Sequence, residues 1–434
     1  MFDPVAFIET RRDGKPHPSG ELELFVRECL AGRVADYQIA AWLMATYLKG
    51  LSREELLEFT LALAHSGEAV SFPDARRCVD KHSTGGVGDK VTLVVVPLVA
   101  ACGVPVAKLS GRGLGFTGGT VDKLDAIPGF RSRLPLEHFV RQVATLGCAI
   151  SGHSLNLAPA EGIFYALRDV TGTISSLPLI ASSIVSKKLA GGTERFVFDV
   201  KVGKGAFMPT PEQGRELAHL LVDLSRDLGA QALAFLTAMD FPLGRWVGNA
   251  AEVREAIAVL QQQGPEDTED LCVAIGGGMV FLGGAAASLD EGQALVRNAL
   301  RSGAALDKFA ALVAAQGGDP RVVTSPEKLL PLAPETREIV APREGYLVGI
   351  DARQVGEAVR LLGGGRYRKE DPVDLGVAVE ILAPLGAPVA QGQPLVRLHG
   401  GSSVRLAEAQ NALEPWVIIE DAPPPVRPLW EVLA

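Results

Sequence analysis

Residues 80–90 read Asp-Lys-His-Ser-Thr-Gly-Gly-Val-Gly-Asp-Lys, and a second glycine-rich stretch with similar donors follows at residues 108–120. Glycine lets backbone amides approach a ligand closely, while lysine and short hydroxyl side chains supply charge and hydrogen bonds. The two stretches offer such groups at Lys81, Ser83, Lys108, Ser110 and Thr120. We therefore predict that both loops bind one phosphate.

Neither stretch matches the two commonest phosphate motifs. No Gly-x-x-x-x-Gly-Lys-Ser/Thr run occurs, and no Gly-x-Gly-x-x-Gly opens a helix after a strand. A single glycine-rich loop is often a plain turn. Two loops with matching donors make that interpretation much weaker.

These stretches and several later motifs resemble those of the thymidine and pyrimidine-nucleoside phosphorylases. The resemblance covers nearly the whole chain, with the motifs in the same order. It implies reversible phosphorolysis of uridine, deoxyuridine or thymidine to the free base and (deoxy)ribose 1-phosphate, with phosphate as co-substrate and no required cofactor. The matching motifs are Lys81–Asp89, Ser110–Gly115, Thr117–Leu124, Tyr165–Asp169, Ser183–Lys188 and Asp199–Met208.

The resemblance also implies roles for single residues. It assigns pyrimidine binding to Arg168, Ser183 and Lys187, and we expect Arg168, Lys187 and His82 to act in catalysis. Ser183 and Lys187 are four residues apart and so share one helix face. The phosphate-binding residues would be Lys81, Ser83, Thr92, Lys108, Ser110 and Thr120.

Two roles are open for His82. Because histidine titrates near neutral pH, it could donate a proton or a hydrogen bond to the base carbonyl. Alternatively, the neighbouring Lys81 keeps it neutral and it only orients a loop.

The sequence departs from the family pattern at two positions. Lys90 stands where relatives carry Thr or Ser, a position that helps to bind potassium in the pyrimidine-nucleoside branch. The other residues of that site correspond to Gly88, Leu243, Trp246 and Glu255. We expect a Lys90–Glu255 ion pair to replace the ion, with no metal requirement. The second departure is Phe116, which replaces a histidine and makes the pocket wall more apolar.

The composition limits which kinds of binding partner and which cellular compartment are expected. The formal net charge of the 434 residues is −9, and no Lys/Arg-dense run occurs, which argues against nucleic acid or a membrane surface as partner. The five cysteines lack paired spacing, Met1 does not begin a signal-like segment, and no charge-free apolar run reaches 18 residues. We expect a cytoplasmic enzyme.

The hydrophobic pattern predicts an α/β protein with three parts. A discontinuous all-helical domain would combine residues 1–67 with 158–190 and bind the base. A larger α/β domain with a mainly parallel sheet, residues 68–157 and 191–335, would bind phosphate, and residues 336–434 would form an α+β subdomain. The resemblance implies a homodimer joined through the helical domain, and Leu24, Leu43 and Leu48 could lie at that interface or in the core.

Several local expectations accompany this division. Residues 91–102 are expected to be a helix that starts at the first phosphate loop, although their valines would also suit a strand. Thr120 is expected to cap a helix that runs through Leu124. Residues 290–315 are expected to be one helix, and residues 334–342 a linker.

Placing the phosphate and base residues on different domains implies a cleft that closes before reaction. Three alternatives compete with the leading interpretation. A thymidine phosphorylase would accept only 2'-deoxynucleosides, although Lys108 favours the broader branch. A phosphoribosyltransferase like the anthranilate enzyme would need magnesium and an acidic pair, which the sequence does not place. A nucleotide-binding protein without activity would show no turnover.

Overall fold

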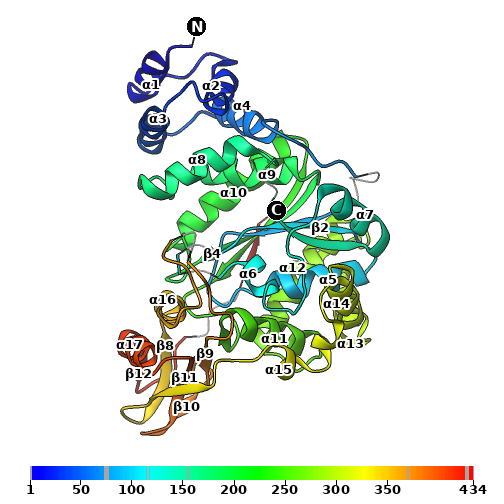
Figure 1. Cartoon of the computed structure of the whole chain (residues 1–434), viewed down its shortest axis with the longest axis vertical. Coiled ribbons are helices and arrows are strands. Elements are labelled where there is room, and N and C mark those ends of the chain that lie inside the picture. The colour runs from blue at the N-terminus through cyan, green and yellow to red at the C-terminus, as the bar shows by residue number, and fades with distance from the viewer. Residues whose placement is uncertain are drawn as a thin grey trace.

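The structure, a computed structural model, describes residues 2–72, 78–113, 115–116, 118–153, 156–368, 371–425 and 430–433. Three parts follow one another along its long axis (Figure 1). N-terminal helices lie at one end, an α/β part with a mainly parallel sheet occupies the middle, and small β-sheets with two helices lie at the other end. This confirms the predicted fold class. Leu114 and Thr117, which belong to the quoted motifs, lie outside the described residues.

The N-terminal part is entirely helical in the described residues. Ser52 starts one helix with a capping box, since its hydroxyl accepts from the Glu55 amide at 3.2 Å and its own amide donates to the Glu55 carboxylate at 2.8 Å. The first helix was not anticipated from the sequence. The four helices are α1 (Pro4–Arg12), α2 (Glu21–Leu30), α3 (Asp36–Lys49) and α4 (Arg53–Ala64).

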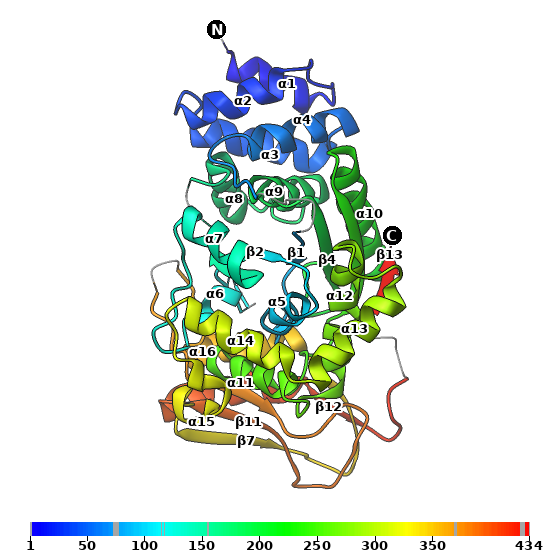
Figure 2. The same ribbon diagram turned by 90° about the vertical axis from the view of Figure 1, so that its right-hand side faces the viewer.

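Two later helices, α8 (Pro159–Val170) and α9 (Leu177–Ala190), pack against these four (Figure 2). Phe164 on α8 inserts among the aromatic rings of the first helices, with ring centroids 5.7 Å from Phe25, 6.1 Å from Trp42 and 5.2 Å from Phe59. Segments about a hundred residues apart therefore share one hydrophobic core, as the discontinuous domain requires. The residue bounds of the three domains stay a prediction.

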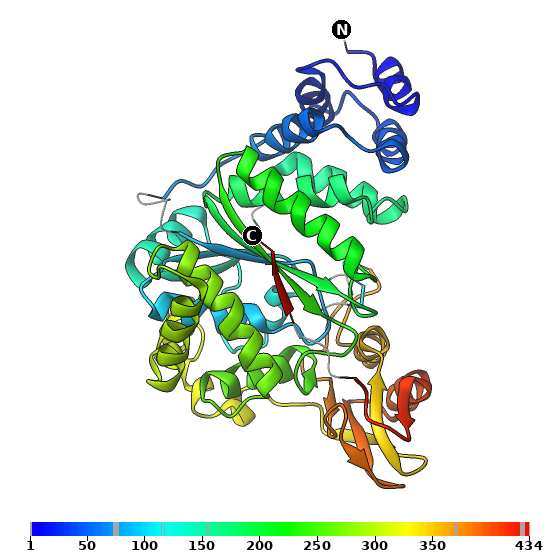
Figure 3. The ribbon, with the colours of Figure 1, turned by 180° about the vertical axis from the view of Figure 1, so that it is seen from behind.

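The central sheet has the strand order β1-β4-β5-β13, and β1, β4 and β5 run parallel. A separate parallel pair, β2 and β3, joins it through a bridge between Val79 and Val106. Figure 3 shows β13, near the end of the chain, returning antiparallel to the edge of β5. The strands are β1 (Asp80–Ser83), β2 (Val106–Ser110), β3 (Cys148–Gly152), β4 (Arg195–Val202), β5 (Gln231–Ala238) and β13 (Trp430–Leu433).

Helices cover the sheet, and the run after Lys90 is helix α5, buried along almost its whole length as expected for an apolar helix in a core. The helices of this part are α5 (Val91–Ala101), α6 (Thr120–Leu124), α7 (Leu136–Leu146), α10 (Pro211–Asp227), α11 (Asn249–Leu260), α12 (Glu266–Leu282), α13 (Leu289–Arg301), α14 (Ala304–Ala315) and α15 (Pro326–Leu329), with a 3-10 turn at Pro320–Val323. In the described part of the chain, no helix is both long enough and apolar enough to cross a bilayer.

Three local expectations were wrong. Residues 290–315 form two helices, because Gly303 adopts a left-handed φ of 80° that breaks the run. Thr120 is the first helical residue of α6 rather than its cap, and the cap position is Gly119. Asp80–Ser83 were expected to belong to a loop but form strand β1. The sequence of this strand is short and polar, so it gives no signal of a strand in a parallel sheet.

The C-terminal part contains two antiparallel sheets, β6-β9-β11-β7 and β10-β8-β12. The expected linker at residues 334–342 is largely strand β7, which looked like a linker because it is mostly exposed on a sheet edge. Strand β6 comes from the α/β part and pairs with β9. The elements are β6 (Trp246–Val247), β7 (Glu335–Val340), β8 (Gly345–Ile350), α16 (Ala352–Leu362), β9 (Ala378–Ile381), β10 (Pro388–Val389), β11 (Pro394–Gly400), α17 (Ser403–Leu413) and β12 (Val417–Glu420), with a 3-10 turn at Glu414–Trp416.

The shared aromatic core can be tested at Phe164. Replacement by alanine should lower the free energy of unfolding of the helical part by about 3–5 kcal/mol, because it leaves a cavity between α8 and the first helices. Val170→Ala is the matched control at the exposed end of the same helix and should cost less than about 0.5 kcal/mol. Urea unfolding followed by circular dichroism measures both. Equal midpoints for the two variants would show that α8 does not belong to this core.

Candidate active site

A group of buried lysines and aspartates lies on β1, β2, β4 and the adjoining α9. Lys81 on β1 is fully buried, and its ammonium lies 2.7 Å from the Asp199 carboxylate of β4 and 3.8 Å from Asp89. Lys201 lies 2.9 Å from the same Asp199. Asp199 therefore holds two ammonium groups from neighbouring strands together.

Lys188 on α9 and Lys108 on β2 complete this lysine–aspartate cluster. Lys188 donates to Asp80 at 2.6 Å and to the Leu109 carbonyl at 3.2 Å, which ties the helix to both strands. Lys108 donates to the Lys81 carbonyl at 2.6 Å and lies 3.9 Å from Asp80. Four lysines, Lys81, Lys108, Lys188 and Lys201, thus face three carboxylates, Asp80, Asp89 and Asp199.

Burial and the neighbouring charges shift the pKa values of Lys81 and Lys108 in opposite directions. For Lys81, burial disfavours the ammonium form, but Asp199 and Asp89 outweigh burial and hold the pKa above its ordinary value. For Lys108, burial and the neighbouring Lys188 lower the pKa well below its ordinary value. An anion bound beside Lys108 would restore its charged form, because it would supply the missing negative charge.

The predicted hydroxyl groups lie at the ends of the strands and at the starts of helices. Ser83 ends β1, and its hydroxyl donates to Asp89 at 2.5 Å and accepts from the Gly85 amide at 3.2 Å. Ser110 ends β2, while Thr92 and Thr120 lie in the first turns of α5 and α6. Ser83, Ser110 and Thr120 are half-buried, and Thr92 is buried. Strand ends and helix N-termini are where open parallel sheets bind anions.

His82 lies where the two predicted sets of residues meet. Burial lowers its pKa well below the ordinary value, and the charges of Lys188, Lys108, Lys187 and Lys81 lower it further. Of the two roles left open for His82, these surroundings favour the neutral imidazole. A neutral imidazole can still donate or accept one hydrogen bond, but it holds no extra proton to give at pH 7.

The predicted base residues lie on α8 and α9. Lys187 donates to the Ser183 hydroxyl at 3.2 Å, as their spacing on one helix face predicts, and lies 3.1 Å from Glu161. Ser183 also donates to Glu161. The Lys187 ammonium lies 5.3 Å from the centre of the Tyr165 ring. This cluster offers a cation, a hydroxyl and an aromatic ring, which suit the carbonyl groups and the face of a pyrimidine.

Arg168 is also buried on α8, but its guanidinium serves another loop. It donates to the carbonyls of Leu179 at 2.8 Å and Ile174 at 2.7 Å, and burial lowers its pKa to about 10. It thus fastens the segment between α8 and α9. Because the guanidinium has five N–H groups, a base could bind to an unused one or replace one of these carbonyls.

Sequence reasoning missed several residues of this site. Glu161 could have been found, because it lies four and seven residues before Tyr165 and Arg168 on the same helix face. His153 follows β3, and its amide donates to the Ser110 carbonyl at 3.2 Å. Asp199 and Lys201 lie in the Asp199–Met208 motif, but only the pairing of β4 with β1 brings them to Lys81.

The predicted Lys90–Glu255 ion pair is confirmed. The Lys90 ammonium contacts the Glu255 carboxylate and donates to the carbonyls of Leu243 at 2.7 Å and Trp246 at 3.0 Å. Gly88 adopts a φ of 71°, and its Cα faces the Leu243 carbonyl so closely that a Cβ would lie 2.6 Å from it. The ammonium thus fills a cage of oxygen atoms in the core beside the first phosphate loop.

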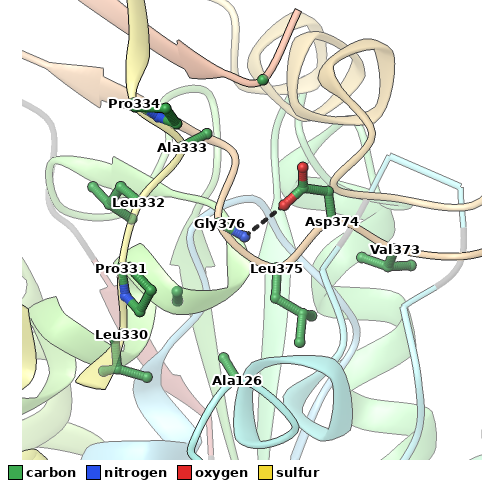
Figure 4. A pocket seen from close by; sticks show the side chains of 12 residues that line it. Ala126, Leu330, Pro331, Leu332, Ala333, Pro334, Val373, Asp374, Leu375 and Gly376 are labelled. Carbon is green, nitrogen blue, oxygen red and sulfur yellow. Dashed lines mark hydrogen bonds between the residues drawn. The ribbon is translucent and has the colours of Figure 1, made fainter. Parts of the chain in front are cut away.

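A cavity of about 550 Å³ is a separate feature (Figure 4). It lies between the α/β and C-terminal parts and is lined mainly by apolar side chains, with Asp374 turned back to accept from the Gly376 amide at 3.0 Å. None of the predicted site residues lines it.

Comparison with known proteins identifies the family of the chain. Three family models match the chain. They are "Glycosyl transferase family, a/b domain" over residues 75–306, "Glycosyl transferase family, helical bundle domain" over 5–67, and "Pyrimidine nucleoside phosphorylase C-terminal domain" over 346–420. The pyrimidine-nucleoside phosphorylases of Staphylococcus epidermidis and Staphylococcus aureus are 45% and 44% identical over 396 residues, covering 91% of this chain and 91% of theirs.

A solved structure supports the fold alone. Anthranilate phosphoribosyltransferase from Thermus thermophilus superimposes with a TM-score of 0.59 at 20% identity, covering 71% of this chain and 98% of its own. The sequence matches, by contrast, extend through the helical, α/β and C-terminal parts. The chain therefore belongs to the pyrimidine-nucleoside phosphorylase family.

Proposed function

We propose that this protein catalyses reversible phosphorolysis of pyrimidine nucleosides, with uridine, deoxyuridine and thymidine as substrates and inorganic phosphate as co-substrate. The observation that carries the proposal is the lysine–aspartate cluster, in which four buried lysines face three carboxylates next to a second cluster suited to a pyrimidine. No cofactor other than phosphate is required by this chemistry.

The phosphate would bind at the ends of β1 and β2. Ser83, Ser110 and Thr120 would donate hydroxyl hydrogen bonds to its oxygens, while Lys81 and Lys108 supply charge and Thr92 lies beside them in the first turn of α5. Binding a dianion would offset the surplus positive charge of the cluster. Held in one orientation, the phosphate can attack the anomeric carbon as positive charge grows on the sugar.

The departing base would lie against α8 and α9. Lys187 would stabilise the negative charge that develops on the pyrimidine carbonyl as the glycosidic bond breaks, and Ser183 would hold the ring edge. Arg168 would join them through an unused N–H group or by exchanging one of its carbonyl partners for the base. His82, held neutral by its surroundings, would act as a hydrogen-bonding group rather than as a proton source.

We also propose that the cleft between these two sets of residues closes around both substrates. Lys187 and Lys188 are adjacent on α9. Lys187 faces the base cluster, whereas Lys188 is fixed to Asp80. Closure of this cleft would bring the base and the phosphate together and exclude water.

Phosphate-dependent release of base is the direct test. Purified protein should release uracil or thymine from uridine, deoxyuridine and thymidine only when phosphate is present. Lys187→Met should lower kcat/KM by about 100-fold or more, because a charge that stabilises the departing base is lost. Lys328→Met, an exposed lysine on α15, is the matched control and should leave the rate unchanged.

The same assay separates the alternatives. Turnover of thymidine without uridine would identify a thymidine phosphorylase restricted to 2'-deoxynucleosides. Activity with phosphoribosyl pyrophosphate and magnesium, without phosphorolysis, would identify a phosphoribosyltransferase. Absence of all turnover would contradict the proposal that this is an enzyme.

We further propose that Lys90 takes the place of the potassium ion expected in this branch of the family. Its ammonium donates to two backbone carbonyls and pairs with the Glu255 carboxylate, which are ligands that an alkali cation would use. The Glu255 and Glu252 carboxylates outweigh burial and raise the pKa of Lys90, so the ammonium stays charged.

Removal of potassium checks this proposal. The rate of the wild-type enzyme should change less than about twofold when choline replaces potassium, since the cation is built into the chain. Lys90→Thr should become potassium-dependent, with at least about a tenfold difference in rate and a potassium-dependent rise in Tm. A wild-type enzyme that loses activity without potassium and regains it with potassium would contradict the substitution.

The homodimer is likewise a proposal, supported by exposed apolar side chains on α3. Tyr37 is 77% exposed and Leu48 is 69% exposed, with Met44 and Tyr47 nearby on the same helix. Of the leucines expected at an interface or in the core, Leu43 is fully buried in the core and Leu24 is half-buried. We also propose a cytoplasmic location, in keeping with the reduced thiols of Cys29, Cys102, Cys148 and Cys272.

A charge on this helix should separate the subunits. Leu48→Glu should shift the protein from dimer to monomer in size-exclusion chromatography with light scattering, because a buried unpaired carboxylate is costly. Val404→Glu, on an equally exposed valine of α17, should leave the mass unchanged. A wild-type protein that elutes as a monomer at micromolar concentration would refute the dimer.

A further inference from the structure

The glycine loop between Ser110 and Thr120 is anchored by one buried carboxylate. Asp122 on α6 has a side chain only 5% exposed, and it accepts from the Gly113 amide at 2.7 Å and from Arg112 at 2.8 Å. Both donors belong to the loop itself. The position of the loop backbone therefore depends on how Asp122 is held.

A third donor to Asp122 comes from the C-terminal part. Arg366 follows α16, and its guanidinium lies 2.9 Å from the same carboxylate oxygen that Arg112 contacts. The Arg366 side chain is 17% exposed, whereas that of Arg112 is 40% exposed. The Arg366 guanidinium is thus more buried than that of Arg112, and the attraction within an ion pair is stronger where less water surrounds it.

The segment that carries Arg366 is itself fixed to the α/β part. The Asn249 side chain donates to the Gly364 carbonyl at 3.1 Å. Glycines of the two parts, with Asp122, Asn249 and Arg366, enclose a cavity of only about 10 Å³. That space holds at most one water molecule. The two surfaces are therefore closely fitted next to the loop.

Helix α16 contacts the same loop at Phe116. The Arg353 guanidinium lies 5.1 Å from the centre of the Phe116 ring, and Gly356 lies against the Phe116 carbonyl, where a Cβ would come within 2.3 Å. Figure 1 shows α16 at the border between the α/β part and the C-terminal sheets. The C-terminal part thus touches the loop at both Asp122 and Phe116.

We propose that Arg366 is a positioning residue for the phosphate site. Through Asp122 it holds the glycine loop so that the hydroxyls of Ser110 and Thr120, at the two ends of that loop, face the same phosphate. The C-terminal part is then a component of the phosphate site, although none of its side chains touches the phosphate. This inference rests on the proposed phosphorolysis and adds a residue to it.

The kinetic signature of this role is selective. Arg366→Met keeps an unbranched apolar stem but removes the charge, so the KM for phosphate should rise about tenfold or more. The KM for uridine should stay within about twofold, because Ser183 and Lys187 lie on other helices. Arg366→Lys should recover part of the loss, since a point charge can still pair with Asp122 but without the planar fork.

Two controls separate positioning from general stability. Arg343→Met removes a more exposed Arg–Asp pair of the C-terminal part, with Asp421, that lies away from the loop, and it should change neither KM. A double-mutant cycle with Asp122→Asn should be strongly non-additive, because Arg366 acts only through Asp122. If the Asp122 variants do not fold, the phosphate-selective rise in KM and its partial rescue by lysine decide the matter.

Three outcomes would overturn the inference. They are an unchanged KM for phosphate in Arg366→Met, equal rises in both KM values, and additive effects in the cycle. These results are distinct from failure of the proposed function, in which the wild-type protein itself would release no base. In that case phosphate-induced stabilisation of Tm, compared between wild type and Arg366→Met, replaces KM as the measurement, and an equal shift in both proteins would overturn the inference.

Discussion

The structure depends on the buried ion pairs that join β1, β2, β4 and α9. Asp199 lies between Lys81 and Lys201, and Asp80 lies between Lys188 and Lys108. Buried charges are costly unless they are paired, and removing one partner typically destabilises a protein by about 3–5 kcal/mol. These pairs therefore fix the strands and the helix in one arrangement. Burial and the neighbouring Lys188 lower the pKa of the fourth lysine, Lys108, and a bound anion would restore its charge, so the structural core and the proposed phosphate site share this residue.

The three parts of the chain meet around this group. The helices α8 and α9 belong by packing to the N-terminal helices, yet Lys188 reaches the sheet. The Lys90 ammonium connects the start of α5 with Leu243 and Trp246, and β6, which contains Trp246, pairs with β9 of the C-terminal part. Arg366 reaches from that part back to Asp122. A site assembled in this way can respond as a unit when one of its parts moves.

The sequence was sufficient where function requires a local pattern. The glycine loops and the helix face shared by Ser183 and Lys187 were predicted from residue type and spacing, and the Lys90–Glu255 pair was predicted from the family resemblance. It was insufficient where partners are distant in the chain. Asp199 begins a quoted motif, but its contact with Lys81 follows only from the pairing of β4 with β1. The return of β13 to the central sheet and the contact of Arg366 with Asp122 are tertiary features of the same kind. The sequence left two roles open for His82, because its pKa is lowered by burial and by the charges of four lysines, of which only Lys81 is adjacent in sequence.

The structure of crystals soaked in inorganic phosphate tests the central claim most directly. The account predicts a phosphate at the ends of β1 and β2, within hydrogen-bonding distance of the Ser83, Ser110 and Thr120 hydroxyls and close to Lys108. Phosphate bound only elsewhere, for instance in the apolar cavity beside Asp374, would contradict it, because the lysine surplus would then be a feature of the core without a ligand.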